Sequence, residues 1–87
     1  MPDVTFTVPT LKKGSNPNAP GQAVERLQNL LNTIGSFGLD EDGVFGPATE
    51  TAVKQSQAKL NLTKDGIVGK ATWTALFKTW IFGSLPG

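Results

Sequence analysis

The sequence contains no cysteine and no histidine. Without cysteine there are no disulfide bonds, no thiolate nucleophile and no cysteine-ligated zinc. Without histidine the chain lacks the side chain that most often serves as general base or metal ligand near neutral pH. Most hydrolytic sites need one of these residues, so we expect this chain not to be an enzyme and to hold no metal and no cofactor.

Long apolar runs and a strong net charge are also lacking. No stretch approaches the roughly 20 apolar residues that cross a bilayer, and Met1 to Val4 show no signal peptide. Eight basic residues nearly balance seven acidic ones, which leaves a net charge of +1. Because nucleic acids and anionic membranes attract strongly basic surfaces, we expect neither as a partner.

The length of 87 residues limits the chain to one domain with a thin core. Hydrophobic residues make up 38% of the chain, which is too many for an intrinsically disordered protein. Alternation of Val4, Phe6 and Val8 predicts an extended N-terminal segment over residues 1–10. We expect the domain to cover residues 11–82, a C-terminal tail to cover residues 83–87, and the protein to be a monomer.

Three segments have the spacing of helices. From Gln22 to Gly35, apolar residues recur at three- and four-residue steps, and Gln28 is assigned to the polar face. A second helix is expected to begin near Pro47, because proline is favoured in the first turn. A third is expected over residues 71–82, where an apolar stripe is assigned mainly to the core: Trp73, Leu76, Phe77, Trp80 and Ile81. These segments predict an all-α fold of three helices with short extended or irregular connections.

An internal repeat is the strongest pattern in the chain. Residues 39–53 align without gaps on residues 62–76, and eight of the fifteen pairs are identical. Each copy has an Asp-Gly pair, which predicts a tight turn, then an apolar pair and a second glycine that leads into a helix. The apolar pair, Val44-Phe45 in the first copy, is expected to pack on the core. One turn-into-helix unit is therefore used twice.

An ordered set of motifs covers about residues 11–77, and its most specific part is Asp42-Gly43-Val44-Phe45-Gly46-Pro47 followed by the degenerate copy Gly66-Ile67-Val68-Gly69. This set resembles the bacterial peptidoglycan-binding domain of the three-helix, PGBD-1 type. The resemblance implies a closed three-helix bundle with a pseudo-two-fold internal repeat. It also implies a non-catalytic module that anchors wall-active enzymes, or itself, to peptidoglycan in the cell envelope or outside the cell.

One core position departs from that family, which usually has an aromatic residue where this chain has Ser56. The small side chain should lower stability unless Phe37 or Trp80 fills the space.

Ligand contacts are expected at the two Asp-Gly turns, where backbone amides and short polar side chains would bond the stem peptide or the N-acetyl groups of the sugars. The expected ligand-binding residues are Asp42, Gly43, Phe45, Thr49, Asp65, Gly66, Thr72 and Trp73. Among the aromatic residues of the third helix, Trp73 is the one expected to be exposed, because it aligns with Glu50 in the repeat. The scattered lysines are expected to form a solvated surface, from which a minority could meet stem-peptide carboxylates.

Two other functions are weighed against peptidoglycan binding. A protein-interaction or inhibitory pro-domain could share the same three-helix fold, but metalloprotease pro-domains of that kind use a cysteine, which this chain lacks. A three-helix DNA-binding domain would need a basic recognition helix, whereas the third helix carries Lys78 and at most Lys70. Peptidoglycan binding remains the preferred prediction.

Overall fold

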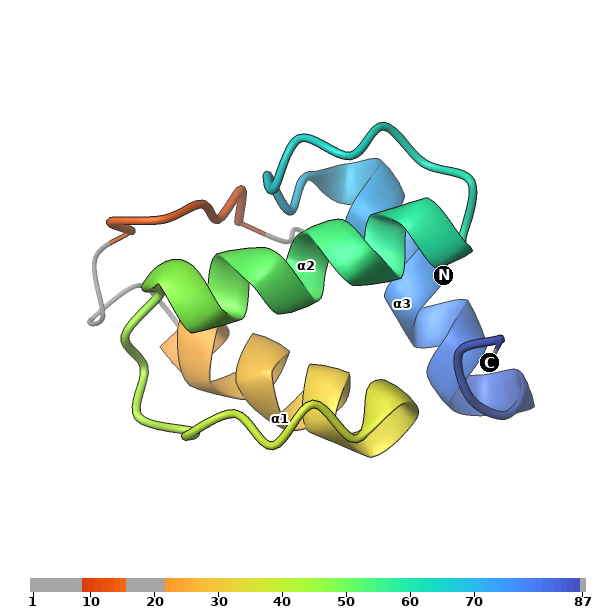
Figure 1. Ribbon diagram of the computed structural model, residues 1–87, viewed down its shortest axis with the longest axis horizontal. Coiled ribbons are helices and arrows are strands. Elements are labelled where there is room, and N and C mark those ends of the chain that lie inside the picture. Colours follow the sequence, from red (N-terminus) through yellow and green to blue (C-terminus); the bar gives the residue numbers. More distant parts are fainter. Residues whose placement is uncertain (1–8, 16–21, 87) are drawn as a thin grey trace, which may run out of the picture.

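Three helices form the fold of the computed structural model, which describes residues 9–15 and 22–86. Helix α1 spans Ala23–Gly35, α2 spans Pro47–Lys59 and α3 spans Lys70–Phe82, with no strand among the described residues. Helix α1 contacts both α2 and α3 (Figure 1). The expected all-α fold of three helices is confirmed. The apolar alternation at residues 4–8 lies outside the described residues.

Helix α1 supplies the centre of the core. Its apolar residues recur every three or four positions, so one broad face points inward, and Val24, Leu27 and Leu31 are fully buried. The other helices and linkers pack buried apolar side chains into the same cluster: Leu11, Phe45, Ala52, Val53, Val68, Trp73 and Leu76. A single core therefore holds the chain together, as its length requires.

Helix α1 ends at Gly35, as the sequence predicts. A Cβ atom at this position would collide with the Phe37 ring, so only glycine lets that ring fold back over the helix end. The C-terminal residues return to the same place, where the Leu85 N–H donates to the Ile34 carbonyl at 2.9 Å. The end of α1 is thus covered by both its own linker and the C-terminal tail.

Residues 9–15 run across the two linkers that precede α2 and α3 (Figure 1). Leu11 is buried and forms an isolated antiparallel bridge with Val68, with N–O distances of 3.0 and 2.7 Å. Three residues later, the Gly14 N–H donates to the Phe45 carbonyl at 3.0 Å. Val68 and Phe45 are equivalent in the repeat, so this segment ties the two repeat units to each other.

The apolar stripe of α3 divides in the middle of the helix. Trp73 and Leu76 are buried, and Phe77 is half-buried and stacks on Trp73 with ring centroids 5.6 Å apart. Trp80 and Ile81 are 55% and 65% exposed, so their assignment to the core is wrong. The C-terminal turn of α3 lies at the edge of the molecule (Figure 1), where α1 and α2 do not cover it.

Trp73 and Ser56 both differ from expectation. Trp73 is only 4% exposed, because its ring packs in the core and its Nε1–H donates to the Pro9 carbonyl at 2.7 Å; the prediction that it is exposed is wrong. Ser56 is fully buried, and its hydroxyl donates to the Ala52 carbonyl one turn earlier at 2.9 Å. Because Trp80 is exposed, it does not fill the space beside Ser56.

Candidate functional site

The first Asp-Gly turn is held against α1 by the side-chain amide of Gln28. The Nε2 atom of Gln28 donates to Asp42 Oδ1 at 3.3 Å and to the Val44 carbonyl at 2.9 Å. It also lies 3.1 Å from the hydroxyl of Thr49 in α2. The N–H of Gly43 donates back to Gln28 Oε1 at 2.9 Å. One side chain therefore connects α1, the turn and the start of α2.

The second turn is held by Gln57 of α2 through the same set of atoms. The Nε2 atom of Gln57 donates to Asp65 Oδ1 at 3.0 Å and to the Ile67 carbonyl at 2.9 Å. It lies 3.2 Å from the Thr72 hydroxyl of α3, and the Gly66 N–H donates to Gln57 Oε1 at 3.0 Å. The repeat found in the sequence thus corresponds to a repeated hydrogen-bond network.

The two glutamines are structural residues that sequence reasoning missed. Both are 1% exposed, so the placement of Gln28 on the polar face is wrong. A buried amide is stable only if its donors and acceptor are satisfied, and the described residues leave no buried side-chain nitrogen or oxygen without a partner. A signal was present, because the spacing of Val24 and Gln28 in the first helix recurs as Val53 and Gln57 in the second.

The two turn aspartates have lowered pKa values for matching reasons. The Val44 N–H donates to Asp42 Oδ1 at 2.9 Å, and this bond, reinforced by Gln28, holds the pKa of Asp42 below its usual value. The Ile67 N–H does the same for Asp65 at 2.9 Å, with Gln57 second, so the pKa of Asp65 is also lowered. Both side chains are therefore carboxylates at neutral pH.

Six of the eight expected contact residues lie inside the fold: Gly43, Phe45, Thr49, Gly66, Thr72 and Trp73. Their side chains or backbone atoms shape the turns and the core. Asp42 and Asp65 are the two expected contact residues whose side chains lie at the surface. Of the expected set, these two aspartates are therefore the residues whose side chains are open to solvent.

Two exposed apolar side chains accompany the aspartates. Val44 and Ile67 occupy the same position in the repeat and are 57% and 39% exposed. The expectation that Val44 packs on the core together with Phe45 is wrong for Val44, since only the second member of the pair is buried. Each turn therefore presents one carboxylate and one branched apolar side chain, a combination that suits the polar and apolar faces of a sugar or a peptide.

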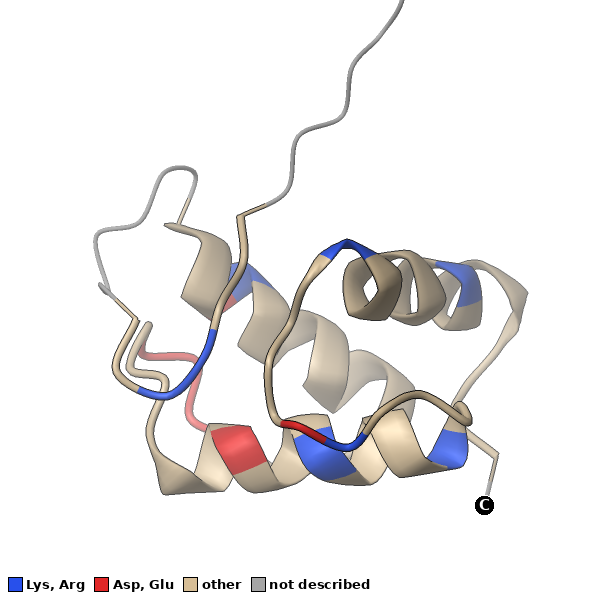
Figure 2. Ribbon diagram, turned by 90° about the horizontal axis from the view of Figure 1, so that it is seen from above, with Lys and Arg blue, Asp and Glu red and all other residues tan. Residues whose placement is uncertain are grey.

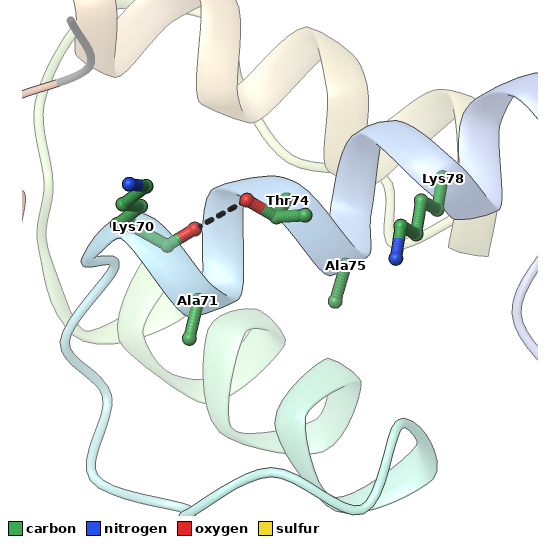
Figure 3. Close-up of a pocket in the computed structure, with 5 residues that line it drawn as sticks. All are labelled: Lys70, Ala71, Thr74, Ala75 and Lys78. Carbon is green, nitrogen blue, oxygen red and sulfur yellow. Dashed lines mark hydrogen bonds between the residues drawn. The ribbon is translucent and has the colours of Figure 1, made fainter.

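A shallow pocket of about 560 Å³ lies on α3, lined by Lys70, Ala71, Thr74, Ala75 and Lys78. Figure 3 shows Ala71, Ala75 and Lys78 extending to one side of the helix and the Lys70 side chain extending to the other. Helix α3 carries these two lysines and no acidic residue (Figure 2), whereas α1 and α2 each carry charges of both signs. Sequence reasoning did not single out this pocket.

Residues 9–15 and 22–86 contain no group of three or more Asp or Glu side chains that could hold an ion. The carboxylate of Glu41, which lies beside Asp40 and Asp42 in the sequence, accepts bonds from Asn29 and Asn32 of α1 at 3.1 and 3.0 Å. No described helix is long and apolar enough to cross a membrane.

Comparison with known proteins adds one finding. Residues 20–76 match the model of a family described as a peptidoglycan binding domain. The match includes α1, α2, both turns and the buried half of α3. No curated protein matches the chain.

Proposed function

The chain belongs to the peptidoglycan binding domain family, and on that premise we propose that it is a non-catalytic module that holds itself, or an enzyme joined to it, on peptidoglycan. The observation that supports this proposal is the family match over residues 20–76, within which both turn networks lie. The place of action is the cell envelope or the outside of the cell, where this polymer is found.

We further propose that the exposed parts of the two turns contact the polymer. Asp42 and Asp65 accept hydrogen bonds from amide and hydroxyl groups, while Val44 and Ile67 pack against methyl groups or sugar faces. The six buried residues of the expected set act indirectly, because they keep the turns in position. Two similar weak contacts on one module, repeated along a polymer, raise the overall affinity through effective concentration.

Sedimentation with insoluble peptidoglycan tests the module's function. The purified domain is mixed with sacculi, with cellulose, with chitin and with DNA, and the pelleted fractions are compared. We expect enrichment with sacculi alone. A domain that stays in the supernatant with sacculi of several wall chemistries would refute the proposal.

Serine substitutions at the turns test the contact surface. We expect Val44→Ser with Ile67→Ser to weaken sacculus binding about threefold to tenfold, since each removes roughly 1 kcal/mol or less of apolar contact. The control is Ile81→Ser, which removes a more exposed branched apolar side chain near the end of α3. Equal binding by the double variant and the control would exclude the turns as the contact surface.

A protein-interaction function has one observation in its favour. Trp80, Ile81 and Phe82 form a run of exposed apolar residues at the end of α3, and Phe82 is 85% exposed. Exposed apolar patches often mark contacts with other proteins. Light scattering over a range of protein concentrations tests self-association. A dimer that is lost on Trp80→Ser would support this function, whereas a monomer at all concentrations would exclude self-association.

A further inference from the structure

The pocket on α3 is lined by two alanines and two lysines. Ala71 and Ala75 form its floor, Lys78 extends to the same side of the helix, and Lys70 lines the other end with its side chain turned away from the alanines (Figure 3). Positions 70 and 78 are separated by eight residues, which corresponds to about 12 Å along a helix. The Thr74 hydroxyl donates to the Lys70 carbonyl at 2.8 Å, so its oxygen keeps the capacity to accept a bond at the rim.

No described carboxylate neutralises this face. The ion pair in the described chain lies elsewhere, between Lys54 and Glu50 of α2 at 4.0 Å, and no acidic side chain of residues 9–15 or 22–86 pairs with Lys70 or Lys78. The first turn of α3 contains no acidic residue, unlike those of α1 and α2, which hold Glu25 and Glu50. The positive end of the helix dipole therefore adds to the charge of Lys70.

We propose that this pocket binds the acidic stem peptide of peptidoglycan, in an extended conformation along α3. Lys70 and Lys78 pair with two carboxylates of the peptide, and the small side chains of Ala71 and Ala75 leave room for its methyl groups. An extended peptide of about four residues spans about 13 Å, which is close to the rise of about 12 Å along α3 between positions 70 and 78. The proposal rests on the proposed function and assigns the peptide part of the polymer to a surface separate from the turns.

A binding titration with an isolated peptide tests the pocket. The probe is a synthetic stem peptide of alanine, γ-linked glutamate, diaminopimelate and alanine, titrated into the isotopically labelled domain. We expect the largest amide shift changes at Ala71, Thr74 and Ala75. Amidation of the peptide's carboxyl groups should abolish these changes, and so should about 1 M salt, which shortens the screening length to about 3 Å.

Charge reversal at the pocket tests the two lysines. Lys70→Glu with Lys78→Glu should weaken peptide binding at least tenfold, because each change replaces an attraction by a repulsion. The matched control is Lys13→Glu with Lys64→Glu, which changes the net charge equally at exposed positions away from the pocket. Thermal unfolding shows whether each variant is folded. Ala71→Phe is a second test of the pocket, because it fills the pocket without changing the charge and should also weaken peptide binding.

The outcomes separate this inference from the proposed function. Peptide shifts on α3 that disappear in the Lys70/Lys78 variant but not in the control confirm the pocket. Sacculus binding with no peptide binding to α3, or with equal peptide binding by both variants, overturns the pocket and leaves the wall-binding function standing. Failure of the unchanged domain to bind sacculi refutes the proposed function, whatever the peptide does.

Discussion

The glutamines of the two turn units lie at different distances from their turns along the chain, yet both units form the same network. Gln28 and Asp42 are 14 residues apart, whereas Gln57 and Asp65 are 8 residues apart. The corresponding bonds nevertheless agree within 0.3 Å, the largest difference being 3.3 against 3.0 Å for the bond to aspartate. The glutamine and the turn must meet in space, and the chain between them can vary as long as it returns to that point.

The first linker, residues 36–46, has additional side-chain bonds to α1. Asn32 of α1 donates to the Leu39 carbonyl and accepts from the Leu39 N–H, both at 2.8 Å. Among the described residues, Gln57 of α2 is the one side-chain amide that bonds the second linker. The two linkers, residues 36–46 and 60–69, have nearly the same length, but two further amides, those of Asn29 and Asn32, bond the first one. We infer that the second turn depends more heavily on its single glutamine.

Replacing each glutamine by leucine is expected to have the largest effect. Leucine has a similar volume but leaves the buried Gly N–H and the apolar-pair carbonyl without their partner, so Gln57→Leu should lower the free energy of unfolding by about 2–4 kcal/mol. Gln28→Leu should cost less, because Asn32 still holds the first linker. Urea unfolding of both variants measures the two losses.

The inference that the second turn depends more on its glutamine is contradicted if Gln28→Leu lowers the free energy of unfolding more than Gln57→Leu does. A larger loss for Gln28→Leu would mean that the linker bonds of Asn32 contribute little. Amide hydrogen exchange at Gly43 and Gly66 then serves as the local control, since each glutamine variant should increase exchange at its own turn first.

The core offers a second contrast, at the residue before each glutamine. Leu27 in α1 and Ser56 in α2 are both fully buried, yet one is large and apolar and the other small and polar. Ser56→Leu makes the second unit match the first at this point. Because the position is already enclosed, we expect overpacking to cost about 1–3 kcal/mol.

Ser56→Ala is the control for that change. It removes the hydroxyl that bonds the Ala52 carbonyl without adding volume, so its effect should stay within about 0.5 kcal/mol. A stabilising Ser56→Leu substitution, seen as a higher midpoint in thermal unfolding, would show that space beside Ser56 is unfilled.

The elements that depend on nearby residues were predictable from the sequence. Helical spacing located α1, Pro47 located the start of α2, and the Asp-Gly pairs located both turns, because each of these signals acts within a few positions. Burial of Gln28 and Trp73 was not predictable in the same way. Gln28 bonds a turn 14 residues away, and Trp73 bonds the carbonyl of Pro9, 64 residues away.

The candidate site was harder to predict because most residues of the turns stabilise the fold, whether or not they also contact a ligand. The repeat correctly marked the turns, but alignment does not distinguish a buried residue such as Thr49 from an exposed one such as Val44. The pocket on α3 contains no motif at all. Its five lining residues share one side of α3, and which side of the helix stays uncovered is known only once the helices are packed.

Alanine at the turn glycines should have a smaller effect than the glutamine changes. Gly66 has a φ of +74°, and a Cβ there would lie 3.1 Å from Lys54 Cε and 3.2 Å from Glu50 Cγ. Gly66→Ala should cost roughly 1–2 kcal/mol for the left-handed backbone, plus the adjustment of these side chains. Gly14→Ala measures the cost of the left-handed backbone alone, because Gly14 has a φ of +88° and no atom near its Cβ position. Equal losses of stability for the two variants would show that the side chains of Lys54 and Glu50 move away from the added Cβ atom at position 66 at no cost.

Acid should have the smallest effect, and it should act on both turns alike. The pKa values of Asp42 and Asp65 are lowered in the folded state, first by the N–H groups of Val44 and Ile67. A carboxyl group with a lowered folded pKa stabilises the fold above its unfolded pKa of about 3.9, and this stabilisation is lost as the pH falls through the folded value. The melting temperature should therefore fall below about pH 4.

Asparagine substitutions decide whether the turns cause that fall. Asp42→Asn with Asp65→Asn keeps an oxygen that accepts the same backbone bonds but removes the titration. We expect the double variant to be less stable than the natural chain at pH 7 and to lose less on acidification, as measured by thermal unfolding from pH 7 to pH 2. If only one of the two single variants, Asp42→Asn or Asp65→Asn, reduces the dependence of the melting temperature on pH, the two units differ electrostatically despite their matching bonds. If neither single variant nor the double variant does, acid acts on other carboxyl groups.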